Sequence, residues 1–205
     1  MLTVNAEQRR NRRATWAWAL WDWAEQPYPT IFQTFIFATY IVSESFGNPD
    51  ANTQALALAG AIAGVAVAII SPVFGRRTDE AGQRKRWLLI NSGILIAIMA
   101  ASYFIEPNPA FFIAGITLYA IGSVVQESAF INYYSMLKQV SNENNMGRIS
   151  GFAWGLGYVG GILLLLFSLV GFFLPDVPWF GVTKDNAENI RVMFLFSAVW
   201  MTVFT

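Results

Sequence analysis

Hydrophobic residues are grouped in six long stretches, separated by short connections that contain charged residues, Pro, Gly or Asn. A bilayer core of about 30 Å is crossed by about 20 helical residues, and most of the stretches reach that length. The pattern therefore predicts an all-α integral membrane protein with six membrane-spanning helices. The predicted segments cover residues 15–40, 54–74, 87–105, 110–136, 149–174 and 190–205.

The first segment is predicted to be a retained helix with an internal break. It is too long for a signal-peptide core, contains Asp22 and Glu25, and shows no small-residue cleavage site. Pro27 and Pro29 lack the backbone N–H that a continuous helix uses, so a kink or broken turn is expected there. Such a break needs a protein or water lining, because lipid cannot satisfy free backbone groups.

The sixth segment is unusually short. Its sixteen residues would span about 24 Å of helix, and no basic flank follows them. We expect the chain to be a fragment that stops inside the sixth helix, so that a six-helix carboxy-terminal half is absent. The alternative is a naturally short final helix.

The composition excludes several classes of protein. Hydrophobic residues make up 55 % of the 205 and charged residues 13 %, whereas about a quarter of a soluble domain is charged. His and Cys are absent, which excludes Ser-His-Asp triads, disulfides, and His or Cys zinc sites. Ser150 has no His to activate it, so we expect no enzymatic activity, cofactor or metal. Thirteen basic residues balance thirteen acidic ones, so no nucleic-acid partner is expected.

Basic residues are strongly biased to one set of connections. Cytoplasmic flanks of membrane helices are enriched in Lys and Arg. Eleven of the thirteen precede the first segment or follow the second and the fourth, and only Lys184 and Arg191 lie on the other side. The bias predicts a basic cytoplasmic amino terminus over residues 1–14, followed by a six-helix transmembrane half over residues 15–205. The membrane, bacterial inner or vacuolar, is left open.

The six segments divide into two sets of three with similar features. The second and fifth carry glycines four residues apart, which let helices approach closely in lipid, and the first and fourth carry carboxylates. Because the two sets start on opposite sides, we expect a 3+3 inverted repeat, as in many secondary transporters. The alternative is that glycine is simply common in membrane helices. The glycines are Gly60, Gly64, Gly151, Gly155, Gly157 and Gly161.

Three carboxylates lie inside predicted membrane segments, where an ionised group is costly unless it is paired or hydrated. Glu127 and Glu25 lie at a similar depth, about 13 Å from the cytoplasmic edges of their segments. They are expected to face one cavity and to respond to protons or cations. The alternative is that each accepts hydrogen bonds from neighbouring helices and never titrates. Asp22 lies nearer the cytoplasmic face, with Arg148 as its expected partner.

Uncharged polar residues follow one face of the first segment and gather in the fourth. Such residues line a substrate path or form a polar seam between helices, and both interpretations are open. The candidates are Gln26 and Gln33 in the first segment and Gln126, Asn132 and Tyr133 in the fourth. Trp16, Trp18, Trp21 and Trp23 are assigned to an interfacial belt without a substrate role.

The connection between the second and third segments reads SPVFGRRTDEAGQRKRW. Gly75 and Gly82 permit a tight backbone turn, and Asp79 can accept hydrogen bonds from the amino terminus of a neighbouring helix. A glycine, an aspartate four residues on, a glycine three further and then basic residues resemble the signature of the major facilitator superfamily. The matching residues are Gly75, Asp79, Gly82, Arg84 and Lys85.

Two further strings narrow the resemblance. WALWDWAEQPYPTIFQTFIF in the first segment and NMGRISGFAWGLGYVGG in the fifth are similar to the vacuole-effluxer branch, whose fungal member exports amino acids from the vacuole. The resemblance implies a twelve-helix fold of two six-helix halves, with substrate held between them and alternating access by rocking. It also implies that the first and fourth segments line the cavity and that Asp79 helps to latch the halves together.

Two functions are compatible with these features. The leading hypothesis is the amino-terminal half of a secondary transporter that exports a small solute, such as an amino acid, with Glu127 and Glu25 as proton- or cation-sensitive groups. The alternative is a six-helix scaffold or assembly subunit without transport. A half-size transporter that dimerises lies between them. The expected partners are therefore the lipid bilayer, a small-molecule substrate, and either the missing half or a second copy.

Overall fold

The chain is helical over almost its whole length in a computed structural model. The structure describes the backbone of residues 2–80 and 82–205, and the side chains of residues 12–72 and 82–205. No strand occurs in these described parts. The α-helices are α1 (Leu2–Glu25), α2 (Phe37–Ile41), α3 (Pro49–Glu80), α4 (Arg84–Ser102), α5 (Phe112–Val140), α6 (Met146–Ser168) and α7 (Glu188–Phe204).

All six predicted segments are helical, and in the part of the chain that the structure describes five contain a helix with the length and composition of a membrane span. These five candidate spans cover Pro49–Pro72, Arg84–Ser102, Pro109–Val140, Met146–Phe173 and Asp185–Phe204. The first predicted segment is not among them, because its helix α1 is polar and charged along much of its length and ends at Glu25. Helix α1 also begins at Leu2, well before the predicted start of the segment.

The first segment is interrupted at its prolines, as the sequence predicts. After Glu25 the chain passes Pro27 and continues as a π-helix over Tyr28–Phe35, and α2 follows. The wider turn is visible in its hydrogen bonds, since the Ile36 amide donates to the carbonyl of Ile31 five residues earlier, at 3.0 Å. The break therefore changes the direction of polar side chains in the middle of the segment.

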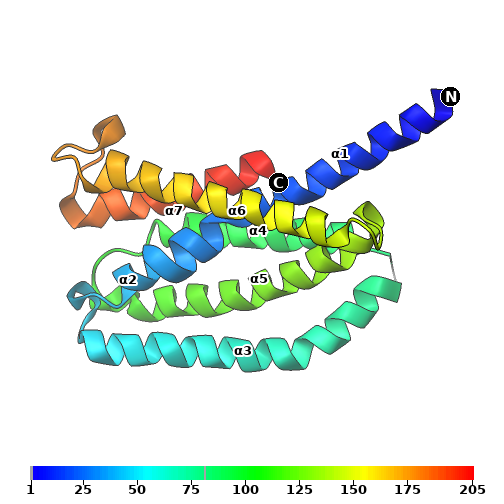
Figure 1. Cartoon of the computed structure of the whole chain (residues 1–205). Coiled ribbons are helices and arrows are strands. Elements are labelled where there is room, and N and C mark those ends of the chain that lie inside the picture. The colour runs from blue at the N-terminus through cyan, green and yellow to red at the C-terminus, as the bar shows by residue number, and fades with distance from the viewer. Residues whose placement is uncertain (1, 81) are drawn as a thin grey trace.

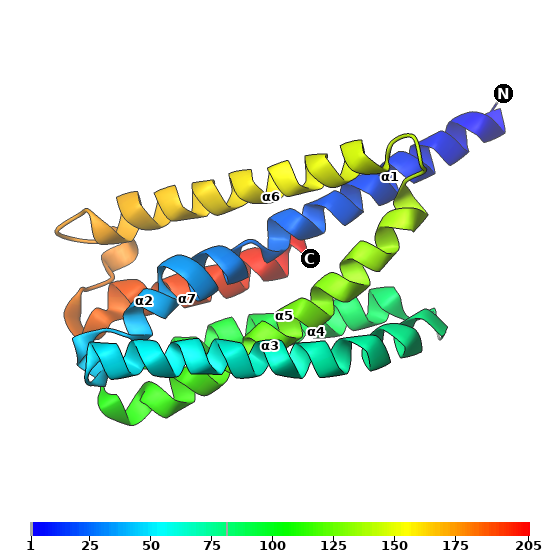
Figure 2. The ribbon, with the colours of Figure 1, turned by 60° about the horizontal axis from the view of Figure 1, so that its bottom comes forward.

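The helices form two groups that share an interior (Figures 1 and 2). Helix α1 packs against α6 and α7, whereas α3 and α4 both pack against α5. Contacts of α4 with α7 and of α1 with α5 join the two groups. Helices α1, α4, α5, α6 and α7 thus each touch members of both groups.

One end of the bundle carries most of the described basic residues. The connections α3–α4 and α5–α6 lie at this end, and the amino-terminal part of α1 projects beyond it (Figure 1). Helix α3 contains Pro72 and bends in its last turns, which brings its end beside α4. Gly82 has a φ of +62° in the short turn that follows, and Arg84 Nη1 donates to the carbonyl of Ser135 in α5 at 2.6 Å.

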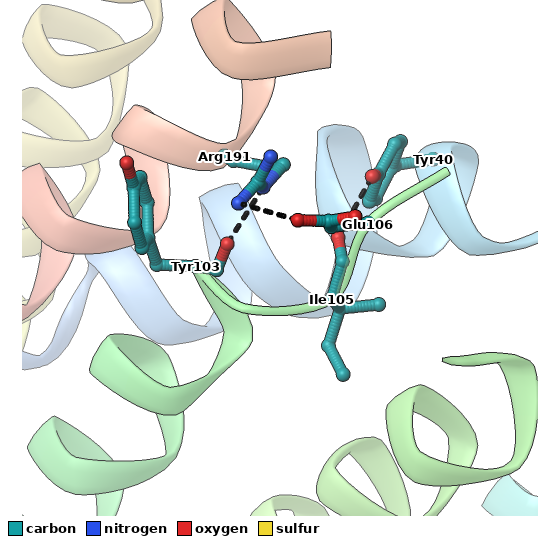
Figure 3. Close-up of polar contacts among 5 residues, drawn as sticks. All are labelled: Tyr40, Tyr103, Ile105, Glu106 and Arg191. Carbon is teal, nitrogen blue, oxygen red and sulfur yellow. Dashed lines mark hydrogen bonds and ion pairs between the residues drawn. The ribbon is translucent and has the colours of Figure 1, made fainter. Parts of the chain in front are cut away.

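The other end is fastened around Arg191 of α7 (Figure 3). Its Nε donates to the carbonyl of Tyr103 at 2.7 Å, and its guanidinium lies 4.9 Å from the centre of the Tyr103 ring. A terminal nitrogen of Arg191 lies 3.8 Å from the carboxylate of Glu106, and the Tyr40 hydroxyl donates to the carbonyl of Ile105 at 2.8 Å. These contacts join α2, the α4–α5 connection and α7.

Trp18 and Trp21 of α1 do not belong to an interfacial belt, which corrects the sequence-based assignment for these two residues. Trp18 and Trp21 are buried, and their ring N–H groups donate to the carbonyl of Tyr133 and to Ser92 Oγ, at 3.0 and 3.1 Å. Trp23 stacks on Trp200 of α7. Of the four, Trp16 is the one that stays half exposed. The amphipathic indole ring suits both settings, so sequence alone does not separate them.

Glycines differ in whether they face a neighbouring helix. Gly157 of α6 lies against Asp22 of α1 and against Gln26, and Gly161 lies against Gln26 and against Thr30 of the π-helix. In contrast, no described atom of a neighbouring element lies within 4 Å of a Cβ placed at Gly60, Gly64, Gly151 or Gly155, so these four do not mediate close helix contacts among the described residues. The small residues that α3 buries are Ala59 and Ala63.

Gly122→Ala is expected to destabilise the protein. A Cβ at this position of α5 would overlap the hydroxyl oxygen of buried Tyr28 and lie 2.8 Å from its Cζ. Overpacking of this kind costs about 1–3 kcal/mol, so the midpoint of thermal unfolding in detergent should fall by several degrees.

Gly93→Ala is the matched control, because nothing lies within 4 Å of a Cβ placed there and alanine is the better helix former. Adding Tyr28→Phe to Gly122→Ala should recover part of the loss. Equal midpoints for Gly122→Ala and Gly93→Ala would contradict the packing described for the π-helix against α5.

Candidate functional site

Glu25 is the most deeply buried carboxylate among the described residues. It is the last residue of α1, immediately before the break, and 0 % of its side chain is exposed. Nε2 of Gln126, from α5, donates a hydrogen bond to Glu25 Oε1. The other oxygen, Oε2, has no hydrogen-bond partner among the described residues. The carboxyl group is therefore half satisfied by one neighbouring amide.

Asp22 lies one turn earlier on α1 and faces α6. Its side chain is 2 % exposed, and its Oδ2 has no hydrogen-bond partner among the described residues. Gly157 makes this approach possible, since a Cβ there would lie 3.3 Å from Asp22 Cγ and 2.9 Å from Nε2 of Gln26. Thr30 Oγ1 donates to Gln26 Oε1 at 3.1 Å, beside Gly161. Asp22 and Gln26 therefore form a seam between α1 and α6.

Tyr133 of α5 is fixed between the tryptophans of α1. Its ring stacks on Trp18 with centroids 4.3 Å apart and lies 4.5 Å from Trp21. The Tyr133 hydroxyl approaches Asp22 without meeting the geometry of a hydrogen bond. A buried hydroxyl and a buried carboxylate oxygen are thus both available at the same place.

Polar contacts continue into α4. Nδ2 of Asn91 donates to Ser128 Oγ at 3.0 Å, and Asn132 Nδ2 donates to the carbonyl of Ser128 at 2.8 Å. Oδ1 of Asn132 has no partner among the described residues. With the side chains of α1 these residues form a set that we call the buried polar layer. Its members are Asp22, Glu25, Asn91, Ser92, Gln126, Asn132 and Tyr133.

The buried polar layer has no basic member. Within the described side chains, the ion pair of Arg191 with Glu106 lies at the far end of the bundle, and no ion pair reaches Asp22 or Glu25. The expected pairing of Asp22 with Arg148 does not form, because Asp22 is buried against α6 whereas Arg148 is exposed at the start of α6. No three Asp or Glu side chains gather as a metal site in the described residues. Two carboxylates are thus buried without a counter-ion.

Glu127 lies apart from this layer. It is exposed on α5, although it is adjacent in sequence to buried Gln126, because successive helical residues point about 100° apart. The structure therefore does not bring Glu127 and Glu25 into one enclosed cavity. Gln33 lies further along the broken segment, where its Nε2 donates to Ser123 Oγ at 3.1 Å.

The connection motif is described only in part. The surroundings of Gly75 and the side chain of Asp79 fall outside the described residues, so the expected role of Asp79 is left open. Gly82 supplies the left-handed turn, Arg84 bonds to α5, and Lys85 is exposed at the start of α4. These contacts fix the α3–α4 connection on the end of α5.

The sequence does not single out several residues of the buried polar layer or the aromatic residues that pack beside it. Asn91 and Ser92 stand in a long apolar segment, and two polar residues in a run are the signal that could have identified them. The sequence assigns Trp18 and Trp21 to an interfacial belt, whereas the structure buries both beside the layer. Tyr28, whose hydroxyl is buried without a partner, lies in the π-helix and gave no separate signal.

Gln126→Leu is expected to destabilise the protein through Glu25. Leu fills a similar volume but cannot donate, so Oε1 of Glu25 loses its described partner and both oxygens are then left without one. Leaving a buried polar group unsatisfied costs about 1–3 kcal/mol, whereas replacing both partners by apolar groups is nearly neutral. The thermal midpoint in detergent should therefore fall for Gln126→Leu and recover when Glu25→Leu is added.

Gln139→Leu provides the matched control on α5, since Gln139 is exposed near the end of that helix. It should leave the midpoint unchanged. If Gln126→Leu and the double variant Gln126→Leu/Glu25→Leu have the same thermal midpoint, Gln126 does not stabilise Glu25.

Comparisons with known proteins agree with a membrane transporter family. The Major Facilitator Superfamily model matches residues 7–165. An uncharacterized MFS-type transporter, YxiO of Bacillus subtilis (strain 168), is 25 % identical over 194 residues, which cover 92 % of this chain and 44 % of the relative. The chain thus spans less than half the length of the relative that it matches. No solved structure matches the chain significantly. The superfamily match covers well over half of the residues and includes four of the five candidate spans wholly or in large part, so the chain belongs to the major facilitator superfamily.

Proposed function

We propose that this chain forms the amino-terminal half of a secondary transporter that moves a small solute by alternating access, with Glu25 as its proton-accepting group. One observation carries the proposal: Glu25 is fully buried beside a helix break, bonded to Gln126 and without a counter-ion in the described residues. Titratable groups inside membrane proteins are rare and mark ion and proton pathways. The family and the MFS-type relative support transport over a scaffold role.

The chemistry of the buried polar layer favours proton or cation uptake at Glu25. An ionised carboxylate that is buried without a partner costs several kcal/mol, and binding a proton or a small cation removes that cost. Glu25 also ends α1, where the helix carbonyls carry partial negative charge that disfavours a second negative charge. Asp22, one turn away, adds to this repulsion. A change of charge on Glu25 would also act on α5 through the hydrogen bond with Gln126, because the Gln126 amide serves as donor or acceptor.

The contact pattern supports a 3+3 inverted repeat. Exchanging the first three segments for the last three converts the α1–α6 contact into the α3–α5 contact, and the α4–α5 contact into the α7–α1 contact. The contacts of α4 with α7 and of α1 with α5 map onto themselves. Such repeats are related by a pseudo-two-fold axis in the membrane plane, and many secondary transporters are built from them. We therefore propose that the broken first segment also crosses the membrane, which together with the five candidate spans makes six.

The proposed path for the solute lies on the outer face of α5. Glu127 and Tyr134 are both exposed there, on a helix whose opposite face is buried. A carboxy-terminal half, or a second copy of the chain, would close this face, and Asp79 would take part in the latch between the two. The basic end faces the cytoplasm in this proposal, in a bacterial inner or vacuolar-type membrane.

The solute is proposed to be an amino acid that is exported. The support is the similarity of the strings around Asp22 and Gly157 to the vacuole-effluxer branch. A zwitterion carries an ammonium group that an exposed carboxylate can bind, so Glu127 is the proposed contact.

Glu25→Gln should remove the pH dependence of transport by the complete protein. Glutamine preserves the shape and hydrogen-bonding capacity of a protonated Glu25 but cannot release a proton. In proteoliposomes, efflux of a radiolabelled amino acid should lose its response to an imposed pH gradient, while exchange without a gradient persists. Glu44→Gln, at an exposed position between α2 and α3, is the control and should keep the response. An undiminished response in Glu25→Gln would refute the proposal.

Glu127→Gln should weaken the binding of the transported amino acid. Loss of a charge-assisted contact typically costs about 1.5–3 kcal/mol, so KM should rise by about tenfold or more. Because Glu127 is exposed, the thermal midpoint should stay unchanged. An unchanged KM would remove Glu127 from the solute path.

A further inference from the structure

Three adjoining hollows at the basic end of the bundle share one residue, Trp16. They have volumes of about 520, 510 and 260 Å³. Their walls come from α1, the α5–α6 connection and the first turns of α6. This region lies about 13 Å from Glu25 along α1, so it is separate from the buried polar layer.

The hollows are strongly cationic. Arg12, Arg13 and Arg148 line them, and no acidic residue does. None of the three arginines has an ion-pair partner among the described residues. The first turn of α6 also begins here, and the start of a helix presents backbone N–H groups without intrahelical acceptors. The amides of Met146 and Ile149 already donate to the carbonyls of Asn142 and Asn145. The three guanidinium groups therefore carry the preference for a phosphate oxyanion.

Polar side chains surround the same place. Ser141, Asn142 and Asn145 of the α5–α6 connection line the central hollow together with Gln139. Asn145 caps the connection by accepting a hydrogen bond from the Asn142 amide at 2.7 Å, which fixes the backbone around it. The side-chain amide of Asn145 keeps its N–H₂ group for a further acceptor.

An apolar wall continues from the arginines toward the membrane-facing surface. Trp16 is 50 % exposed and packs edge to face on Phe152, whose ring is 45 % exposed, with centroids 5.0 Å apart. Leu20 and Ile149 extend this wall along α1 and α6. A soluble phosphate would leave it uncovered, whereas an acyl chain would cover it.

We propose that these hollows bind one anionic phospholipid, with its phosphate held by Arg12 and Arg148 and an acyl chain along Trp16 and Phe152. The juxtaposition of unpaired guanidinium groups with an exposed aromatic wall carries the proposal. Basic pockets between helices at the cytoplasmic face of membrane proteins bind anionic headgroups in this way. The bound lipid would bridge α1 and α6, the two helices whose seam contains Asp22.

The test is native mass spectrometry of the complete, delipidated protein in detergent, titrated with dioleoylphosphatidylglycerol. Dioleoylphosphatidylcholine and glycerol 3-phosphate are titrated separately, to distinguish charge from apolar contact and lipid from free phosphate. The first phosphatidylglycerol should bind at least tenfold more tightly than either. The double variant Arg12→Gln/Arg148→Gln should lose about tenfold or more of that affinity.

Lys138→Gln is the matched control, because Lys138 is exposed in the last turn of α5 and lines none of the three hollows. It should bind phosphatidylglycerol as the unmodified protein does. An equal loss in Lys138→Gln would show general attraction to basic surface and overturn the site. The proposed lipid site would also be overturned if phosphatidylcholine or glycerol 3-phosphate bound as tightly as phosphatidylglycerol.

Discussion

Glu25 accepts a hydrogen bond from Gln126 inside a bundle that provides it with no counter-ion among the described residues. The contact exists because α1 ends at Glu25, where Pro27 prevents the helix from continuing. It joins the broken segment to α5, and the Trp18–Tyr133 stack holds the same two elements in register one to two turns away. A change of charge on Glu25 therefore acts on the contact between two helices that belong to different packing groups.

Small residues and aromatic rings both pack around the buried polar layer and separate it from the surface. Gly157 lets α1 approach α6 so closely that Asp22 and Gln26 lie in the seam, and no side chain of ordinary size fits there. On the opposite side of α1, Trp21 bonds to Ser92 of α4. The layer is thus enclosed by α1, α4, α5 and α6, and a rearrangement of any one of them would open it to water or solute.

Sequence alone predicted the helices and the position of the break, since both follow from the length of apolar runs and from the missing N–H of proline. It also selected Asp22, Glu25, Gln126, Asn132 and Tyr133, because polar residues inside apolar segments are few. It placed Glu127 with Glu25 because depth along a helix can be counted, whereas the facing direction depends on how α5 packs. The same limitation affects Gly60 and Gly64, which lie one position away from the buried alanines of α3.

The most direct test of the account is whether Glu25 binds and releases a proton in the membrane. Infrared difference spectroscopy of the complete protein in lipid, recorded between acidic and alkaline pH, detects the carbonyl band of a protonated carboxylic acid. We expect such a band at neutral pH that disappears on alkalinisation and is absent from Glu25→Gln, while Glu44→Gln retains it. A spectrum of Glu25→Gln that matches that of the unmodified protein at every pH would contradict the account.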